Sequence, residues 1–329
     1  MNEVATETEP IPPAVREDGI GCWGKWLAGI SEARIRKLGS LLGGLIYRVD
    51  VPHRRIVRRN LGFAFPDWPP EKVRRCSLRI FENIGTALLE ILQLRYLEPE
   101  EILRRARIEG LENVAASLAS GRGIVIISAH LGNWELAPLF FALAFGRPMV
   151  LVARKVRPPS LDRWVMGMRT RFGNRVIDKQ GGLGQMMRNL RQGSPLGLLI
   201  DQGTRRSEGV KVTFFDRTVS ATPAAAMLAL RCRSPVYAAF SIRHPEGGFV
   251  LKVFPELEMQ RTKDLRADLK INTEKMLAVI EKMVRAYPEQ WFWVNKRWKH
   301  YHPELYPEYQ ARRWRRKRRK SKHRSANGG

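Results

Sequence analysis

Short apolar runs alternate with helical patterns along most of this chain, and that alternation is the strongest constraint on its fold. Five runs have the length and composition of buried strands, and they occupy residues 124–128, 149–153, 196–200, 236–240 and 249–254. Segments with the apolar spacing of helices occupy residues 134–144, 161–172, 183–192, 224–231 and 264–286. This order predicts an α/β fold with a single mixed or largely parallel sheet flanked by helices.

The first predicted strand is followed by a histidine and a carboxylate. His130 comes two residues after the strand at 124–128, and Glu135 lies near the start of the next predicted helix. Open α/β folds bind their ligands beyond the carboxyl ends of the strands. Histidine accepts a proton near neutral pH, and a carboxylate can fix its tautomer. We therefore expect His130 to be a general base oriented by Glu135, although a structural histidine beside a helix cap fits the same spacing.

This segment also carries a family resemblance. SAHLGNWELAP, which contains His130 and Glu135, resembles the H-x4-D/E signature of the glycerolipid acyltransferase superfamily, in particular its lipid A late-acyltransferase branch of lauroyl and myristoyl transferases. Blocks at residues 58–75, 81–90 and 201–236 resemble the same branch in the same order. One departure is Asp216, which stands where the branch has glycine and puts the local turn in doubt. The resemblance extends from about residue 39 to residue 309.

The resemblance implies an enzyme that moves a fatty acyl chain from a thioester carrier to a hydroxyl of a membrane glycolipid, in lipid A biosynthesis. His130 would remove the proton of the attacking hydroxyl, and the backbone near Gly132 and Asn133, or nearby cations, would stabilise the oxyanion. No serine, cysteine or threonine is set up as a nucleophile, so we expect direct transfer without an acyl-enzyme. No metal or dissociable redox cofactor is implied.

Substrate-binding residues are expected at the same edge of the sheet. Arg154 resembles the arginine of the superfamily's second block, and the turn at residues 201–206 resembles its Glu-Gly-Thr-Arg block. Glycine permits close backbone approach to a ligand, while threonine and arginine donate to phosphate. The alternative is a turn with solvated arginines. The residues expected to bind substrate are Arg154, Arg169, Asp201, Gly203, Thr204 and Arg205.

The chain is strongly basic. It has 58 Lys and Arg against 32 Asp and Glu, a net charge of +26, and ten of these cations lie in residues 311–324. This charge favours a broad anionic partner, such as a phospholipid surface or nucleic acid. Residues 22–47 have apolar, aromatic and basic residues at helical intervals, which fits a helix lying in a membrane interface or one docked on the core. Three cysteines without paired spacing indicate a reducing compartment.

These observations together predict an organisation and a location. We expect a disordered segment at 1–20, a helical membrane-associating region at 21–100, an α/β acyltransferase domain at 101–309, and a disordered basic tail at 310–329. The resemblance implies peripheral or monotopic attachment to the cytoplasmic face of the cell inner membrane. It also implies acyl carrier protein as the donor, an acidic partner for a basic surface, with acyl-CoA as the alternative.

Two other functions fit parts of the sequence. The related branch that acylates phosphatidylinositol mannosides shares the same motifs. A nucleic-acid-binding protein would explain the basic tail, and the Trp-rich segment at 291–299 suits either lipid headgroups or stacking on single strands. Because the chain has no nucleic-acid fold signature, no nucleic-acid partner is expected.

Overall fold

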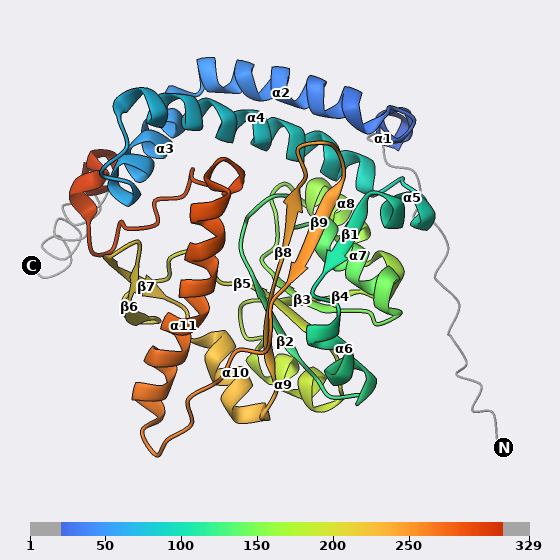
Figure 1. Cartoon of the computed structure of the whole chain (residues 1–329), viewed down its shortest axis with the longest axis vertical. Coiled ribbons are helices and arrows are strands. Elements are labelled where there is room, and N and C mark those ends of the chain that lie inside the picture. Colours follow the sequence, from blue (N-terminus) through green and yellow to red (C-terminus); the bar gives the residue numbers. More distant parts are fainter. Residues whose placement is uncertain (1–20, 312–329) are drawn as a thin grey trace, which may run out of the picture.

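The computed structural model describes residues 21–311, and its centre is a seven-stranded sheet in the order β1-β9-β8-β2-β5-β3-β4 (Figure 1). All neighbouring strands are parallel except β8 and β9. The predicted α/β fold with a largely parallel sheet is therefore confirmed. The strands are β1 (Ala106–Glu109), β2 (Val125–Ser128), β3 (Val150–Ala153), β4 (Arg175–Asp178), β5 (Leu196–Leu199), β8 (Val236–Arg243) and β9 (Phe249–Val253).

The two edge strands, β1 and β4, were not predicted from the sequence. Each is four residues long, and each has two exposed positions. Strands that are short and only partly buried lack the continuous apolar run that marks the central strands of a parallel sheet. Each of these segments is recognisable as a strand only from its pairing with a neighbouring strand.

Helices cover both faces of the sheet because alternate residues of each strand point in opposite directions. Ile126 of β2 and the preceding Ile124 face one core, against α6 (Glu112–Ala119), α7 (Leu136–Phe145) and α8 (Pro159–Arg169). Val125 and Ile127 face the other core, against α9 (Leu183–Arg191), α10 (Ala224–Cys232) and α11 (Leu265–Ala286). The five helices predicted in this part of the chain are all present, and their ends agree with the prediction to within three residues.

A separate hairpin, β6 (Val210–Phe214) and β7 (Arg217–Ala221), packs against α11. Its two turn residues, Phe215 and Asp216, have φ values of 53° and 55°. Two positive φ angles in succession match the twist of a two-residue hairpin, and aspartate tolerates this region better than most residues. Phe215 is held there by its backbone N–H, which donates to Glu281 at 2.6 Å. The turn therefore forms without the family's glycine.

Four helices precede the sheet and lie along one side of it (Figure 1). They are α1 (Gly21–Ala28), α2 (Glu32–Val49), α3 (Val51–Ala64) and α4 (Pro70–Leu94); a short α5 (Pro99–Arg104) follows. The helix predicted at 22–47 is therefore two helices, separated at residues 29–31. Glycines let α2 lie very close to α4, because a Cβ on Gly43 would come 2.1 Å from the carbonyl oxygen of Phe81.

The outer face of α2 is apolar and open. Leu41, Leu45 and Val49 are 65%, 56% and 69% exposed, and they recur at every fourth residue along the helix. Among the described residues, no helix combines the length and apolarity needed to cross a membrane. The expected disordered ends, residues 1–20 and nearly all of residues 310–329, lie outside the described residues.

Candidate active site

His130 is hydrogen-bonded to a carboxylate that follows the neighbouring strand, β5. Its Nδ1 lies 2.8 Å from Oδ1 of Asp201, and its backbone N–H donates to Oδ2 of the same residue at 3.0 Å. The parallel pairing of β2 with β5 sets Ser128 opposite Leu199, so both residues lie two positions beyond paired strand ends. Two bonds to one carboxylate fix both the position and the ring orientation of His130.

Asp201 is buried and ionised. It is 2% exposed, and it accepts a third hydrogen bond from Nε1 of Trp291 at 2.8 Å. Burial raises the pKa of Asp201, but the charge and hydrogen bonds of His130 and the bond from Trp291 outweigh it, so its pKa is lowered. Nearby Arg297 is also buried, which lowers its own pKa to about 10 despite the attraction of Asp201.

The protonation behaviour of His130 follows from the same contacts. Burial lowers the pKa of His130, but the charge and hydrogen bond of Asp201, together with the charge of Glu135, outweigh burial and raise it. With the Nδ1 proton donated to Asp201, Nε2 carries the lone pair. The side-chain amide of Gln202 lies 3.2 Å from Nε2 and can donate to it. Nε2 is therefore the ring nitrogen of His130 that can accept a proton.

Glu135 does not orient His130, contrary to the expectation from their spacing. Its carboxylate instead holds Arg169 through two parallel bonds, from Nε at 2.8 Å and from Nη2. Glu135 follows the turn at the start of α7, where its side chain faces α8 rather than the imidazole. It acts on His130 only through its charge. The ion pair also occupies Nε and Nη2 of Arg169, which was expected to contact substrate.

The expected oxyanion donors at Gly132 and Asn133 are already used. The N–H of Gly132 donates to the carbonyl oxygen of Gln290 at 3.0 Å, and that of Asn133 to the carbonyl oxygen of Ser241 at 3.1 Å. Gly132 has a φ of +61°, and a Cβ there would come 1.9 Å from the oxygen of Ser241, so glycine is required. These amides hold the turn in place and are therefore not free to bind an oxyanion.

A buried ion pair connects this turn to α4. Nε and Nη2 of Arg243 donate to the two carboxylate oxygens of Glu90 at 2.9 and 2.5 Å, and both residues are less than 8% exposed. The same carboxylate accepts from Nδ2 of Asn133 at 3.2 Å. Oδ1 of Asn133 in turn accepts the N–H of Leu136 at the start of α7. The pair therefore fixes Asn133, three residues after His130.

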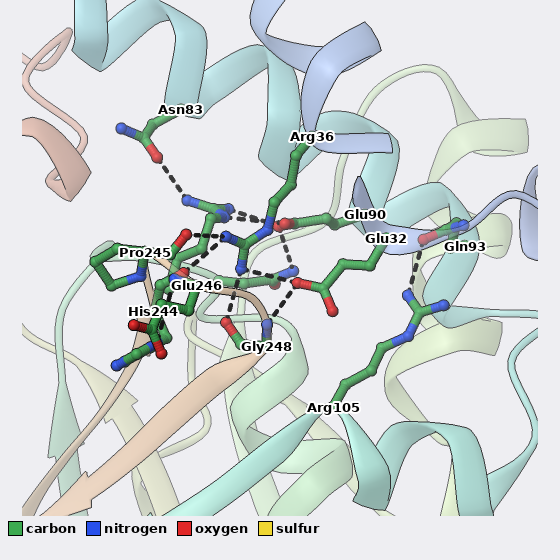
Figure 2. A network of polar contacts seen from close by, with 12 residues as sticks. Glu32, Arg36, Asn83, Glu90, Gln93, Arg105, His244, Pro245, Glu246 and Gly248 are labelled. Atoms are coloured by element: carbon green, nitrogen blue, oxygen red, sulfur yellow. Dashed lines mark hydrogen bonds and ion pairs between the residues drawn. The ribbon is translucent and has the colours of Figure 1, made fainter. Parts of the chain in front are cut away.

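Figure 2 shows further polar contacts beside this pair, made by Glu32 and Arg36 of α2. Arg36 donates to the carbonyl oxygens of His244 and Gly248, at 2.7 and 2.9 Å, in the loop between β8 and β9. Glu32 accepts from the N–H of Gly248 at 2.6 Å. Polar contacts thus tie the open helix α2 to the β8–β9 loop, which directly follows Arg243 of the buried pair.

A cavity of about 410 Å³ opens beside His130. The inner part of the cavity lies between α7 and the sheet. There, Ile126 on β2, Gly197 on β5 and Leu151 on β3 are neighbours in register. Gly197 is half-buried although its strand is central and its neighbours Leu196 and Leu198 are at most 8% exposed. The cavity therefore reaches the backbone of β5, and its walls there are apolar.

The structure separates the expected substrate-binding residues into three groups. Arg154, Arg169 and Gly203 line the cavity. Asp201 does not line the cavity, because it is buried and bonded to His130 and Trp291. Thr204 and Arg205 do not line the cavity. The side chain of Arg205 is 79% exposed and forms an ion pair with Glu208 at 3.3 Å.

Sequence reasoning missed three residues of the site. Gln202 was given no role, Lys179 follows the unpredicted strand β4, and Lys299 lies in the Trp-rich segment. The signal at Gln202 was its position next to Asp201 at a strand end. Lys179 had no comparable signal, because nothing in the sequence distinguishes it from the many other lysines and arginines of a basic chain.

Comparison with known proteins places this site in context. The model for the family described as bacterial lipid A biosynthesis acyltransferase matches residues 19–300. The lipid A biosynthesis lauroyltransferase of Escherichia coli is 27% identical over 267 residues, covering 80% of this chain and 85% of the relative. The palmitoleoyltransferase of the same organism is 23% identical over 264 residues, covering 80% and 84%. The phosphatidylinositol mannoside acyltransferase of Mycolicibacterium smegmatis is 25% identical over 253 residues, covering 74% and 78%.

Proposed function

The chain belongs to the bacterial lipid A biosynthesis acyltransferase family, and from this premise we propose how its residues transfer an acyl chain to a glycolipid. Membership makes the protein a glycolipid acyltransferase of lipid A biosynthesis. The observation that carries the proposed mechanism is the arrangement of His130. Oδ1 of Asp201 lies 2.8 Å from Nδ1 of His130, and the side chain of His130 lines a cavity whose inner part is apolar.

In the proposed reaction, the acceptor hydroxyl takes the place of the Gln202 amide beside Nε2 of His130. Nε2 then removes the proton of this hydroxyl. The hydroxyl oxygen attacks the thioester carbonyl carbon, and the C–S bond then breaks. His130 returns the proton to the departing thiolate, and Asp201 stabilises the imidazolium between these steps. Gln202 and the cations of the cavity are the donors available to the oxyanion.

The apolar part of the cavity suits the acyl chain of the donor. Burial of a methylene contributes about 0.8 kcal/mol, so a chain that enters between α7 and the sheet gains stability with its length. When the acyl chain extends past His130 towards Gly197, its thioester lies beside the imidazole. The basic surface would attract acyl carrier protein, which we propose as the donor, with acyl-CoA as the alternative.

We also propose that the enzyme attaches peripherally to the cytoplasmic face of the inner membrane through α2. Its exposed leucines are flanked by the exposed cations Arg34, Lys37 and Arg48. An apolar stripe bordered by basic residues is the pattern of a helix lying in the headgroup region of an anionic membrane. Because α2 contacts α4 and the β8–β9 loop, the active site would lie at a fixed height above that surface.

The test is a transfer assay with acyl carrier protein thioester and a lipid A precursor. His130→Ala should lower kcat by about 10²–10⁴-fold while the protein stays folded. Glu135→Gln should lower kcat less than His130→Ala does, since Glu135 does not contact the imidazole. A series at varied donor and acceptor should give intersecting double-reciprocal lines.

Three results would contradict the mechanism. Wild-type turnover in folded His130→Ala would exclude this histidine as the base. Parallel double-reciprocal lines, or a trapped acyl-enzyme in mass spectrometry, would indicate a covalent nucleophile. Transfer to a phosphatidylinositol mannoside, but not to a lipid A precursor, would show that the protein uses the acceptor of the related branch.

A further inference from the structure

Three cations from three separate segments line the cavity that contains His130. Arg154 follows β3, Lys179 follows β4, and Lys299 belongs to the Trp-rich segment near the C-terminus. The backbone N–H of Lys179 donates to the carbonyl oxygen of Ala153 at 2.9 Å, so the paired strand ends set Lys179 beside Arg154. Arg154 and Lys179 are exposed and Lys299 is half-buried, which puts the group at the mouth of the cavity.

The cavity's own carboxylates do not neutralise these cations. Glu135 is the one carboxylate among the described residues that line the cavity, and its two oxygens are bonded to Arg169. Within residues 21–311, none of the three cations forms an ion pair with a carboxylate. The mouth of the cavity therefore carries cations without a directly bonded carboxylate, whereas exposed Arg205 is paired with Glu208.

The cations also repel one another. Lys179 is partly shielded from solvent, and this desolvation lowers its pKa; the charge of Arg154 lowers the pKa further, partly offset by Glu208. Burial likewise lowers the pKa of Lys299, followed by the charges of Lys296 and Arg154. Holding like charges together costs free energy that a bound anion would recover, because an anion favours the charged form of each lysine.

We propose that Arg154, Lys179 and Lys299 form a phosphate subsite, which holds a phosphate ester of a substrate while its reacting group lies beside His130. Donors that approach from three segments match a group with several charged oxygens, and the planar guanidinium of Arg154 can bind two of them at once. The proposal rests on the proposed function, in which both substrates bring such esters. A phosphopantetheine thioester carries phosphate on the donor, and a phosphorylated glycolipid carries it on the acceptor.

The first experiment measures binding without catalysis. Full-length protein is titrated calorimetrically with inorganic pyrophosphate, in the wild type and in the inactive His130→Ala variant, and both should bind. Lys179→Ala and Lys299→Ala should each weaken binding by about tenfold, the loss typical of one charge-assisted bond. The matched control is Lys211→Ala, which removes an exposed lysine from β6 and should leave binding unchanged. Equal weakening in Lys211→Ala would mean attraction by the basic surface in general and would overturn the subsite.

The second experiment identifies which substrate brings the phosphate. Donors with and without phosphate are compared, acyl-CoA against an N-acetylcysteamine thioester, together with acceptors with and without phosphate. If the subsite holds the donor, Lys179→Ala raises KM for acyl-CoA but not for the simple thioester. If it holds the acceptor, the rise is confined to the phosphorylated glycolipid. No difference from Lys211→Ala with any pair of substrates would refute the proposal. Failure of the wild type to transfer from every donor would instead refute the mechanism and leave the pyrophosphate result standing.

Discussion

Asp201 holds Nδ1 of His130 at 2.8 Å from a position 71 residues later in the chain. The contact exists because β2 and β5 are adjacent and parallel, so the residues that follow them meet at one edge of the sheet. Both oxygens of Asp201 are used, one on the ring of His130 and the other on its backbone N–H and on Trp291. A base fixed in this way needs no further reorientation when it accepts a proton, which is the condition for efficient general-base catalysis.

This contact predicts a shift in the pH dependence of transfer. His130 must be neutral to act as a base, so the rate rises as pH passes upward through its pKa, which Asp201 raises. Asp201→Asn removes that charge and leaves burial, which lowers the pKa. The acidic limb of the kcat/KM profile should therefore move to lower pH, with a fall in the plateau of about 10²–10⁴-fold. Glu208→Gln, an exposed carboxylate change, is the control. An unshifted limb in Asp201→Asn would show that another group sets the profile.

Acyl-chain preference should depend on Gly197. A Cβ at this position would come 3.0 Å from Cε of Met149 and 3.3 Å from Cδ2 of Leu151, so alanine is tolerated by small side-chain shifts. Gly197→Leu would fill the row between Ile126 and Leu151. We expect kcat/KM for the longest accepted chain to fall by about tenfold or more, with shorter chains spared and Gly197→Ala intermediate. Competition between thioesters of different length measures this. A uniform loss at every length would place the acyl chain elsewhere.

The buried pair of Glu90 and Arg243 should contribute strongly to stability. Removing one member leaves an uncompensated buried charge, which typically costs about 3–5 kcal/mol. Glu90→Ala should lower the free energy of unfolding by this amount in urea titrations. The matched control is Glu71→Ala, since Glu71 and Arg74 form an ion pair with both side chains more than half exposed, worth about 0–1 kcal/mol. Similar losses in the two variants would mean that the buried pair does not hold α4 to the sheet.

Membrane binding should depend on the open face of α2. Leu41→Glu and Leu45→Glu place charges on exposed positions, so they should reduce co-sedimentation with anionic vesicles without affecting the fold. Leu183→Glu alters a 38% exposed leucine on α9, far from α2 in Figure 1, and should have no effect. High salt should release part of the wild type, since each Lys or Arg near the surface contributes about 1 kcal/mol. Full sedimentation of both α2 variants would rule out this face.

The sequence by itself determined the elements that are long and strongly patterned. Apolar runs marked the central strands, and helical spacing marked the helices that cover them, because burial on one side leaves a regular trace along the chain. The pattern also placed His130 beyond the end of β2. It failed at β4, which is short and half-exposed, and at residues 29–31, where one apolar pattern continues across two helices.

Only the tertiary structure decided which groups act together. Spacing along the chain suggested Glu135 as the partner of His130, but the strand order brings Asp201 to the imidazole and turns Glu135 towards Arg169. The meeting of Lys179 with Arg154 likewise depends on the pairing of β3 and β4. Local patterns report how each segment is buried, whereas the order of strands in a sheet is set by contacts between distant segments. The partner of a catalytic side chain is such a contact, so it is absent from any short stretch of sequence.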